Sequence, residues 1–104
     1  MRTLLAGLLT LATASGCRPA APAPTVHVVE ISGMRFVPES LTVAVGDTVR
    51  WVDRDIVPHT ATASGWDTGA ILPGDTGSVV ITAPGEVEYR CTMHPTMTAR
   101  LAAR

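Results

Sequence analysis

Apolar and polar residues alternate with a period of two in several short stretches of this 104-residue chain. The alternation is clearest in Glu86–Cys91, where Val87, Tyr89 and Cys91 fall on one face and the intervening residues are charged. This is the pattern of a half-buried β-strand. Turn-forming residues follow such stretches every 8 to 12 residues or so, as in β-sandwiches. Apolar residues at helical spacing are missing beyond the N-terminal region, so the sequence predicts an all-β sandwich.

The sequence pattern also predicts where the strands lie. Residues 41–45 and 49–51 have matching parity, so we expect Val45, Val49 and Trp51 to share one core. Residues 64–76 are rich in Gly and Pro and are predicted to be mostly loop. The predicted strands are 25–31, 34–37, 41–45, 49–51, 60–63, 78–82, 86–91 and 98–103.

The N-terminal segment has the order of an export signal. A positive charge precedes an apolar run that is too short to span a bilayer, which needs about 20 residues. A buried helix is the alternative, but the run has no polar face. The sequence before Cys17 resembles a bacterial lipobox, which implies cleavage after residue 16 and a lipid on Cys17; ordinary signal cleavage remains the alternative. Residues 17–24 hold three prolines and are predicted to be an extended tether to a domain at residues 25–104.

Charge and cysteine content narrow the function further. The formal net charge of −1 gives no basic surface for nucleic acid. Of the two cysteines, one lies at the predicted signal cleavage site, so Cys91 has no disulfide partner in the domain. A lone thiol retained in an exported protein needs a reason, and metal ligation is a good one. A metal would also stabilise a small domain, which buries little surface by itself.

Cys91, His94 and Met97 follow one another at intervals of three, at the end of the predicted strand. A thiolate, an imidazole and a thioether form a soft donor set that suits copper, whereas zinc gains little from methionine. His59 is the natural second imidazole of a trigonal His₂Cys site with a weak axial Met. His27 lies within a predicted strand and is expected at the surface. Each residue alone has a structural explanation, but their combination predicts a copper site.

The residues around these ligands resemble the small type 1 copper proteins of the plastocyanin, pseudoazurin and amicyanin group, the cupredoxins. The similarity covers residues 26–103, and the ligand spacing is similar to that of amicyanin. It implies a Greek-key β-sandwich with one type 1 copper near one end, His59 and His94 as equatorial ligands, Cys91 as thiolate and Met97 as axial ligand. Many members have Asn in place of Thr60 and Gly in place of Ala99. A Thr hydroxyl can still bond the backbone, so these departures concern the potential and stability.

We therefore expect a periplasmic one-electron carrier rather than an enzyme, because four protein ligands leave no open position for substrate. Redox partners are expected to dock near His94, which lies on a loop, against an apolar rim of Met93, Pro95 and Pro58. We expect a monomer, possible membrane attachment through Cys17, and no nucleic-acid partner. A carrier or buffer that delivers copper itself is the main alternative; a copper enzyme and a metal-free adhesive sandwich are weaker ones.

Overall fold

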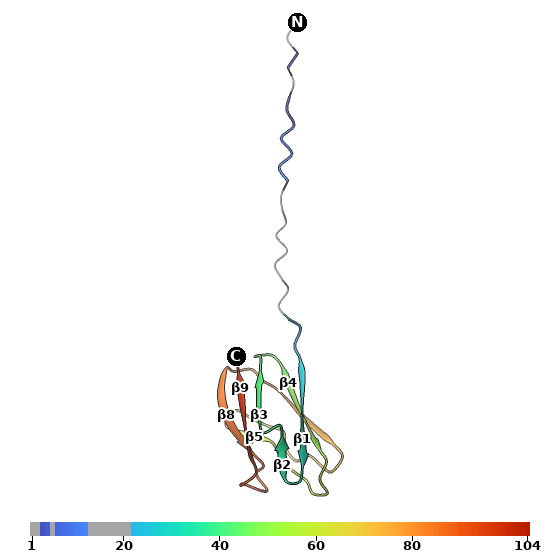
Figure 1. The fold of residues 1–104 in the computed structure, drawn as a ribbon, viewed down its shortest axis with the longest axis vertical. Coiled ribbons are helices and arrows are strands. Elements are labelled where there is room, and N and C mark those ends of the chain that lie inside the picture. Colours follow the sequence, from blue (N-terminus) through green and yellow to red (C-terminus); the bar gives the residue numbers. More distant parts are fainter. Residues whose placement is uncertain (1–2, 5, 13–21) are drawn as a thin grey trace.

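The computed structural model describes residues 3–4, 6–12 and 22–104 (Figure 1). Residues 13–21, with the predicted cleavage site and most of the predicted tether, lie outside this part. None of the described residues is in a helix. The described part of the chain therefore contains no helix that could cross a membrane. The strands are β1 (Val26–Ser32), β2 (Arg35–Val37), β3 (Ser40–Val43), β4 (Thr48–Asp53), β5 (Thr62–Ala63), β6 (Trp66–Asp67), β7 (Thr76–Val80), β8 (Gly85–Arg90) and β9 (Thr98–Ala103).

These strands form two mixed sheets, which confirms the predicted all-β, Greek-key sandwich. One sheet has the order β2-β1-β4-β7 and the other β3-β9-β8-β5-β6. The pairs β1–β4 and β3–β9 are parallel, and the other pairs are antiparallel. The chain enters β1 at the end of the sandwich where β9 finishes (Figure 1). The loop from β8 to β9 therefore lies at the opposite end.

The core lies between the sheets and follows the alternation of the sequence. On β8, Tyr89 is buried while Glu88 and Arg90 are exposed, and Cys91 continues the buried face. Aromatic rings fill the centre: the Tyr89 ring centroid lies 4.7 Å from that of Phe36 and 5.5 Å from that of Trp51. The indole N–H of Trp51 donates to the Tyr89 hydroxyl at 3.3 Å. This buried framework carries Cys91 at its edge.

Two expectations from the sequence need correction. Val45 is 42 % exposed because β3 ends at Val43 and the chain turns away at Gly46, whose φ is 97°. The segment 64–76 is mostly loop, as predicted, apart from the short strand β6, which pairs with β5. The predicted strand 60–63 begins only at Thr62; His59 before it pairs instead with Ile71 as an isolated bridge. Short pairings of this kind depend on tertiary contacts that local alternation does not reveal.

Candidate metal centre

The loop that carries three of the predicted ligands is closed by its own backbone. Cys91 donates its N–H to the carbonyl of Met97 at 3.1 Å, and Met97 donates to the carbonyl of His94 at 2.9 Å. The N–H of His94 reaches back to the carbonyl of Cys91 at 3.3 Å. Because β8 and β9 pair up to Arg90 and Thr98, the loop begins and ends on adjacent strands. Its ligand-type residues are therefore held on a compact turn.

His59 comes from a different part of the chain and is fixed by two backbone bonds. Its N–H donates to the carbonyl of Ile71 at 3.1 Å, and its carbonyl accepts from the N–H of Ile71 at 2.7 Å. The side chain of His59 is fully buried, whereas His94 is only partly buried. This agrees with the expectation that His94, on its loop, is the imidazole that partners approach, and it makes His59 the deeper one.

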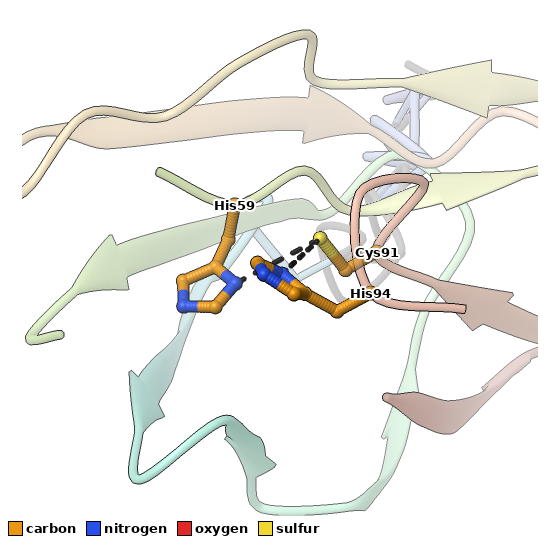
Figure 2. A group of neighbouring side chains, drawn as sticks. All are labelled: His59, Cys91 and His94. Carbon is orange, nitrogen blue, oxygen red and sulfur yellow. Dashed lines mark hydrogen bonds between the residues drawn. The ribbon is translucent and has the colours of Figure 1, made fainter. Parts of the chain in front are cut away.

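Figure 2 shows His59, Cys91 and His94 converging on one point from these two segments. The Sγ atom of Cys91 lies 3.7 Å from Nδ1 of His59 and 3.5 Å from Nδ1 of His94. Donor atoms of the three residues all lie within 4.8 Å of one another. The Met97 side chain is buried, with 5 % exposure, and belongs to the core cluster.

These distances fit a single bound ion. An ion about 2.3 Å from sulfur and about 2.0 Å from nitrogen, with ligand angles of about 110–120°, separates the two donors by about 3.5–3.7 Å. The donor set of one thiolate and two imidazoles, with a thioether three residues after His94, is the soft set that copper prefers. The residues present therefore fit copper, as the sequence predicted.

The surroundings of Cys91 favour its thiolate form. Burial raises the pKa of the thiol, but hydrogen bonds to the sulfur, above all from the Thr60 backbone N–H, outweigh burial and lower the pKa to about 6. The Thr60 N–H lies 3.3 Å from Sγ. A thiolate is the form of cysteine that binds metals. The site is thus prepared for an ion before one binds.

The hydroxyl of Thr60 ties the two ligand-bearing segments together. It accepts the backbone N–H of Thr92 at 2.9 Å and lies 3.1 Å from the Thr92 hydroxyl. The Thr62 hydroxyl lies 3.0 Å from Thr60 Oγ1 and 2.9 Å from a carboxylate oxygen of Asp67. Thr62 is the donor in both contacts, so its single hydroxyl proton is shared between Thr60 Oγ1 and Asp67. A row of hydroxyls therefore runs from the ligand loop to a surface carboxylate.

A carboxylate lies on the far side of His59. Nε2 of His59 is 2.9 Å from Oδ2 of Asp55, so the ring donates there while Nδ1 faces Cys91. Burial raises the pKa of Asp55, but bonds from the backbone N–H groups of Met34 and Gly33 and from His59 outweigh it, and the net pKa is lowered. Asp55 is therefore held as an ionised acceptor.

The four predicted ligands thus lie in two segments that meet at one end of the sandwich, and His27 lies elsewhere. Nε2 of His27 bonds Asp47 at 2.8 Å, at the start of the parallel strands β1 and β4. Sequence reasoning did not find Asp55 or the Thr92 contacts. The spacing of Asp55, four residues before His59, was the available signal, but the segment reads only as a polar loop.

Comparisons with known proteins agree with this geometry. The family model for copper-binding proteins of the plastocyanin/azurin family matches residues 24–102. Amicyanin of Paracoccus denitrificans is 33% identical over 104 residues, covering 93% of this chain and 79% of the relative. Chloroplastic plastocyanin of Chlamydomonas reinhardtii is 38% identical over 74 residues, covering 59% of this chain and 51% of the relative.

Solved structures show the same likeness. A Cu(I) form of an amicyanin variant superimposes with a TM-score of 0.70 at 29% identity, covering 82% of this chain and 88% of the other. A purple cupredoxin from Nitrosopumilus maritimus has a TM-score of 0.69 at 21% identity, covering 75% and 99% respectively, and supports the fold.

Proposed function

The chain belongs to the plastocyanin/azurin family of copper-binding proteins, and we propose that it is a one-electron carrier with one type 1 copper per chain. The observation that carries the proposal is the convergence of a thiolate and two imidazole Nδ1 atoms, from two separate segments, at distances that suit one ion. The proposed ligands are His59, Cys91, His94 and Met97. When bound, copper supplies a Cu(II)/Cu(I) couple.

The protein's part is to hold these ligands still. His59 is fixed by backbone bonds to Ile71, and the ligand loop is closed between Cys91 and Met97. Thr60 joins the two segments through the Thr92 N–H. A site whose donors are fixed in advance needs little rearrangement when its charge changes by one. With four protein donors and no open position, the site suits electron transfer better than catalysis on a bound substrate.

The proposed docking surface lies where His94 approaches solvent. Exposed apolar side chains come from several segments next to the site: Met93 is in the ligand loop, Met34 bonds Asp55 through its N–H, and Leu72 follows the partner of His59. Ile56, three residues before His59, is 95 % exposed. A small apolar surface of this kind suits weak redox encounters, which bury less than about 1,200 Å². This extends the predicted rim beyond Met93, Pro95 and Pro58.

We also propose export, with attachment to a membrane through lipid on Cys17. The arrangement of the strands is compatible with both contacts at once, because β1 starts at the end of the sandwich opposite the ligand loop (Figure 1). An anchor before β1 would therefore leave the His94 end free for a partner, and a tether would raise the local concentration near membrane enzymes. Retention of a Cys17→Ser protein in the membrane fraction would contradict the lipid anchor.

A copper titration tests the proposal. Cu(II) is added to the chain in fractions of an equivalent while the visible spectrum is recorded. We expect an intense absorption of red light that saturates at one equivalent, is bleached by ascorbate and is lost in Cys91→Ser. His27→Gln, which changes a histidine outside the site, should keep the band. A pale solution would place copper away from Cys91 and contradict the proposal. Copper release to a chelator that outpaces electron exchange between copies would favour the alternative, a copper-delivery protein.

A further inference from the structure

Asp55 is a carboxylate held against the buried side of the proposed copper site. Its side chain is 14% exposed, and Oδ2 lies 2.9 Å from Nε2 of His59, whose side chain has no exposed surface. The other ring nitrogen of His59, Nδ1, is the one that faces Cys91. The imidazole therefore bonds Asp55 through Nε2 and faces Cys91 with Nδ1.

The carboxylate is itself fixed by the turn between β1 and β2. The N–H of Gly33 donates to Oδ1 at 2.7 Å, and the N–H of Met34 donates to Oδ2 at 2.9 Å. Both turn residues have φ of 60°, so the two N–H groups belong to a tight left-handed turn. The backbone N–H of Asp55 donates to Oδ1 of Asp53 at 2.8 Å. Asp55 thus cannot swing away without breaking several bonds.

A second metal site at Asp53, Asp55 and His59 would be another explanation, since their donor atoms also lie within 4.8 Å of one another. The contacts argue against it. Both oxygens of Asp55 already accept hydrogen bonds, and Nε2 of His59 donates one of them. A metal there would have to displace the two turn N–H groups and the ring proton. The cluster is better explained as a hydrogen-bonded support for His59.

We propose that Asp55 is a positioning residue for His59, fixing the ring orientation and the tautomer so that Nδ1 offers its lone pair toward Cys91. In a neutral imidazole only one nitrogen carries a proton, and a carboxylate acceptor at Nε2 keeps it there. The same bond makes the imidazole a more basic ligand. This inference rests on the proposed function only in its consequences for copper; the tautomer is a property of the metal-free chain.

Two consequences follow for bound copper. Loss of a carboxylate behind a metal-binding histidine typically lowers metal affinity roughly 10- to 100-fold. A negative charge and a more basic ligand also favour the more highly charged metal state, so their removal shifts the equilibrium toward Cu(I). For one electron, a tenfold shift in that equilibrium raises the reduction potential by about 59 mV.

The chain contains a matched control. Asp47 also accepts two backbone N–H groups, from Thr25 at 2.9 Å and Ala44 at 3.0 Å, and bonds Nε2 of a histidine, His27, at 2.8 Å. It lies before β4, whereas Asp55 lies after it, so the two carboxylates occupy opposite ends of the same parallel strand pair. Asp47→Asn removes a carboxylate that bonds a histidine, as Asp55→Asn does, but it contacts none of the proposed ligands.

The first experiment measures the tautomer of His59 in the metal-free full chain by ¹⁵N NMR of the imidazole ring. We expect a proton on Nε2 and none on Nδ1 in the wild type, and exchange between tautomers in Asp55→Ala. A wild-type ring protonated on Nδ1, or one that exchanges freely, would overturn the proposal. The wild-type part of this measurement needs neither a variant that folds nor copper.

The second experiment measures copper affinity and reduction potential in Asp55→Asn, Asp55→Ala and Asp47→Asn. We expect the two Asp55 variants to raise the potential, Asp55→Ala to lose roughly 10- to 100-fold in affinity, and Asp47→Asn to match the wild type in both. Equal shifts in the Asp47 and Asp55 variants would reduce Asp55 to a structural residue and overturn the proposal. A wild type without the blue band would instead contradict the proposed function, and the tautomer result would still decide this inference.

Discussion

Replacing Thr60 with valine keeps the shape of the side chain and removes the hydroxyl that joins the two ligand-bearing segments. The backbone N–H of Thr92 then loses its acceptor at 2.9 Å, and the Thr92 and Thr62 hydroxyls lose a partner. The Thr60 N–H remains available to Cys91 Sγ, because it belongs to the backbone. The variant therefore isolates the contribution of the hydroxyl.

The expected loss in the free energy of unfolding follows from how deeply these groups are buried. An unpaired buried donor costs about 1–3 kcal/mol. Thr60 is 6% exposed, but Thr92 lies on the surface of the loop, where water replaces part of the lost bond. We expect Thr60→Val to lower the free energy of unfolding by about 1–2 kcal/mol. In a domain of this size each kcal/mol corresponds to about 4–8 °C in Tm, so the loss is roughly 5–15 °C.

The assay is thermal and urea unfolding of the metal-free chain, followed by tryptophan fluorescence. Thr60→Ser keeps the hydroxyl and should stay near the wild type. Thr62→Val removes one hydroxyl of the row but leaves the Thr92 N–H paired, so its loss should be smaller than that of Thr60→Val. If Thr60→Val were as stable as the wild type, or if Thr62→Val cost as much, the hydroxyl would not be joining the segments as the structure indicates.

Two further changes test the scaffold. Asp47 has its pKa lowered to about 2 by hydrogen bonds from the backbone N–H of Thr25, the His27 ring and the backbone N–H of Ala44. Its contribution to stability is therefore present above the unfolded pKa near 3.8 and is lost as the pH falls toward 2. In urea unfolding, Asp47→Asn should be less stable than the wild type at pH 6, and this difference should shrink toward pH 2. A difference independent of pH would contradict the role of the charge. Leu101 is 2% exposed, so Leu101→Ala should lower the free energy of unfolding by about 2–5 kcal/mol. Leu72 is 54% exposed, so Leu72→Ala should leave urea unfolding nearly unchanged. Similar losses of stability in both variants would contradict the placement of the core.

The strands that could be predicted from the sequence are those whose alternation is long enough to show which face is buried. In β8 the charged residues separate Val87, Tyr89 and Cys91 so regularly that the orientation of Cys91 follows directly. Val45 obeys the same alternation but lies past the end of β3, where the left-handed Gly46 turns the chain. Parity alone carries no information about where a strand stops, so the prediction for Val45 was wrong.

The proximity of the candidate ligands could be predicted for a related reason. Cys91, His94 and Met97 are close in sequence, and a short loop at a strand end must keep them close in space. His59 was chosen by elimination between two upstream histidines, and the structure places it 3.7 Å from Cys91. Its supporting residues were not predicted. Asp55 and the turn at Gly33 are 22 residues apart and meet only because β1 and β4 lie side by side.

The two carboxylate–histidine pairs, one before and one after β4, show why residue type alone does not assign a role. Each histidine donates from Nε2 to an aspartate that also accepts two backbone N–H groups. The His27 side chain is 23% exposed at the end where the chain enters the sandwich, while the His59 side chain has no exposed surface and turns its second nitrogen to a thiolate. The same contact therefore fastens a strand end in one place and aims a donor atom in the other. What distinguishes them is the group that the second ring nitrogen faces, and that is set by the packing of the two sheets rather than by the local sequence.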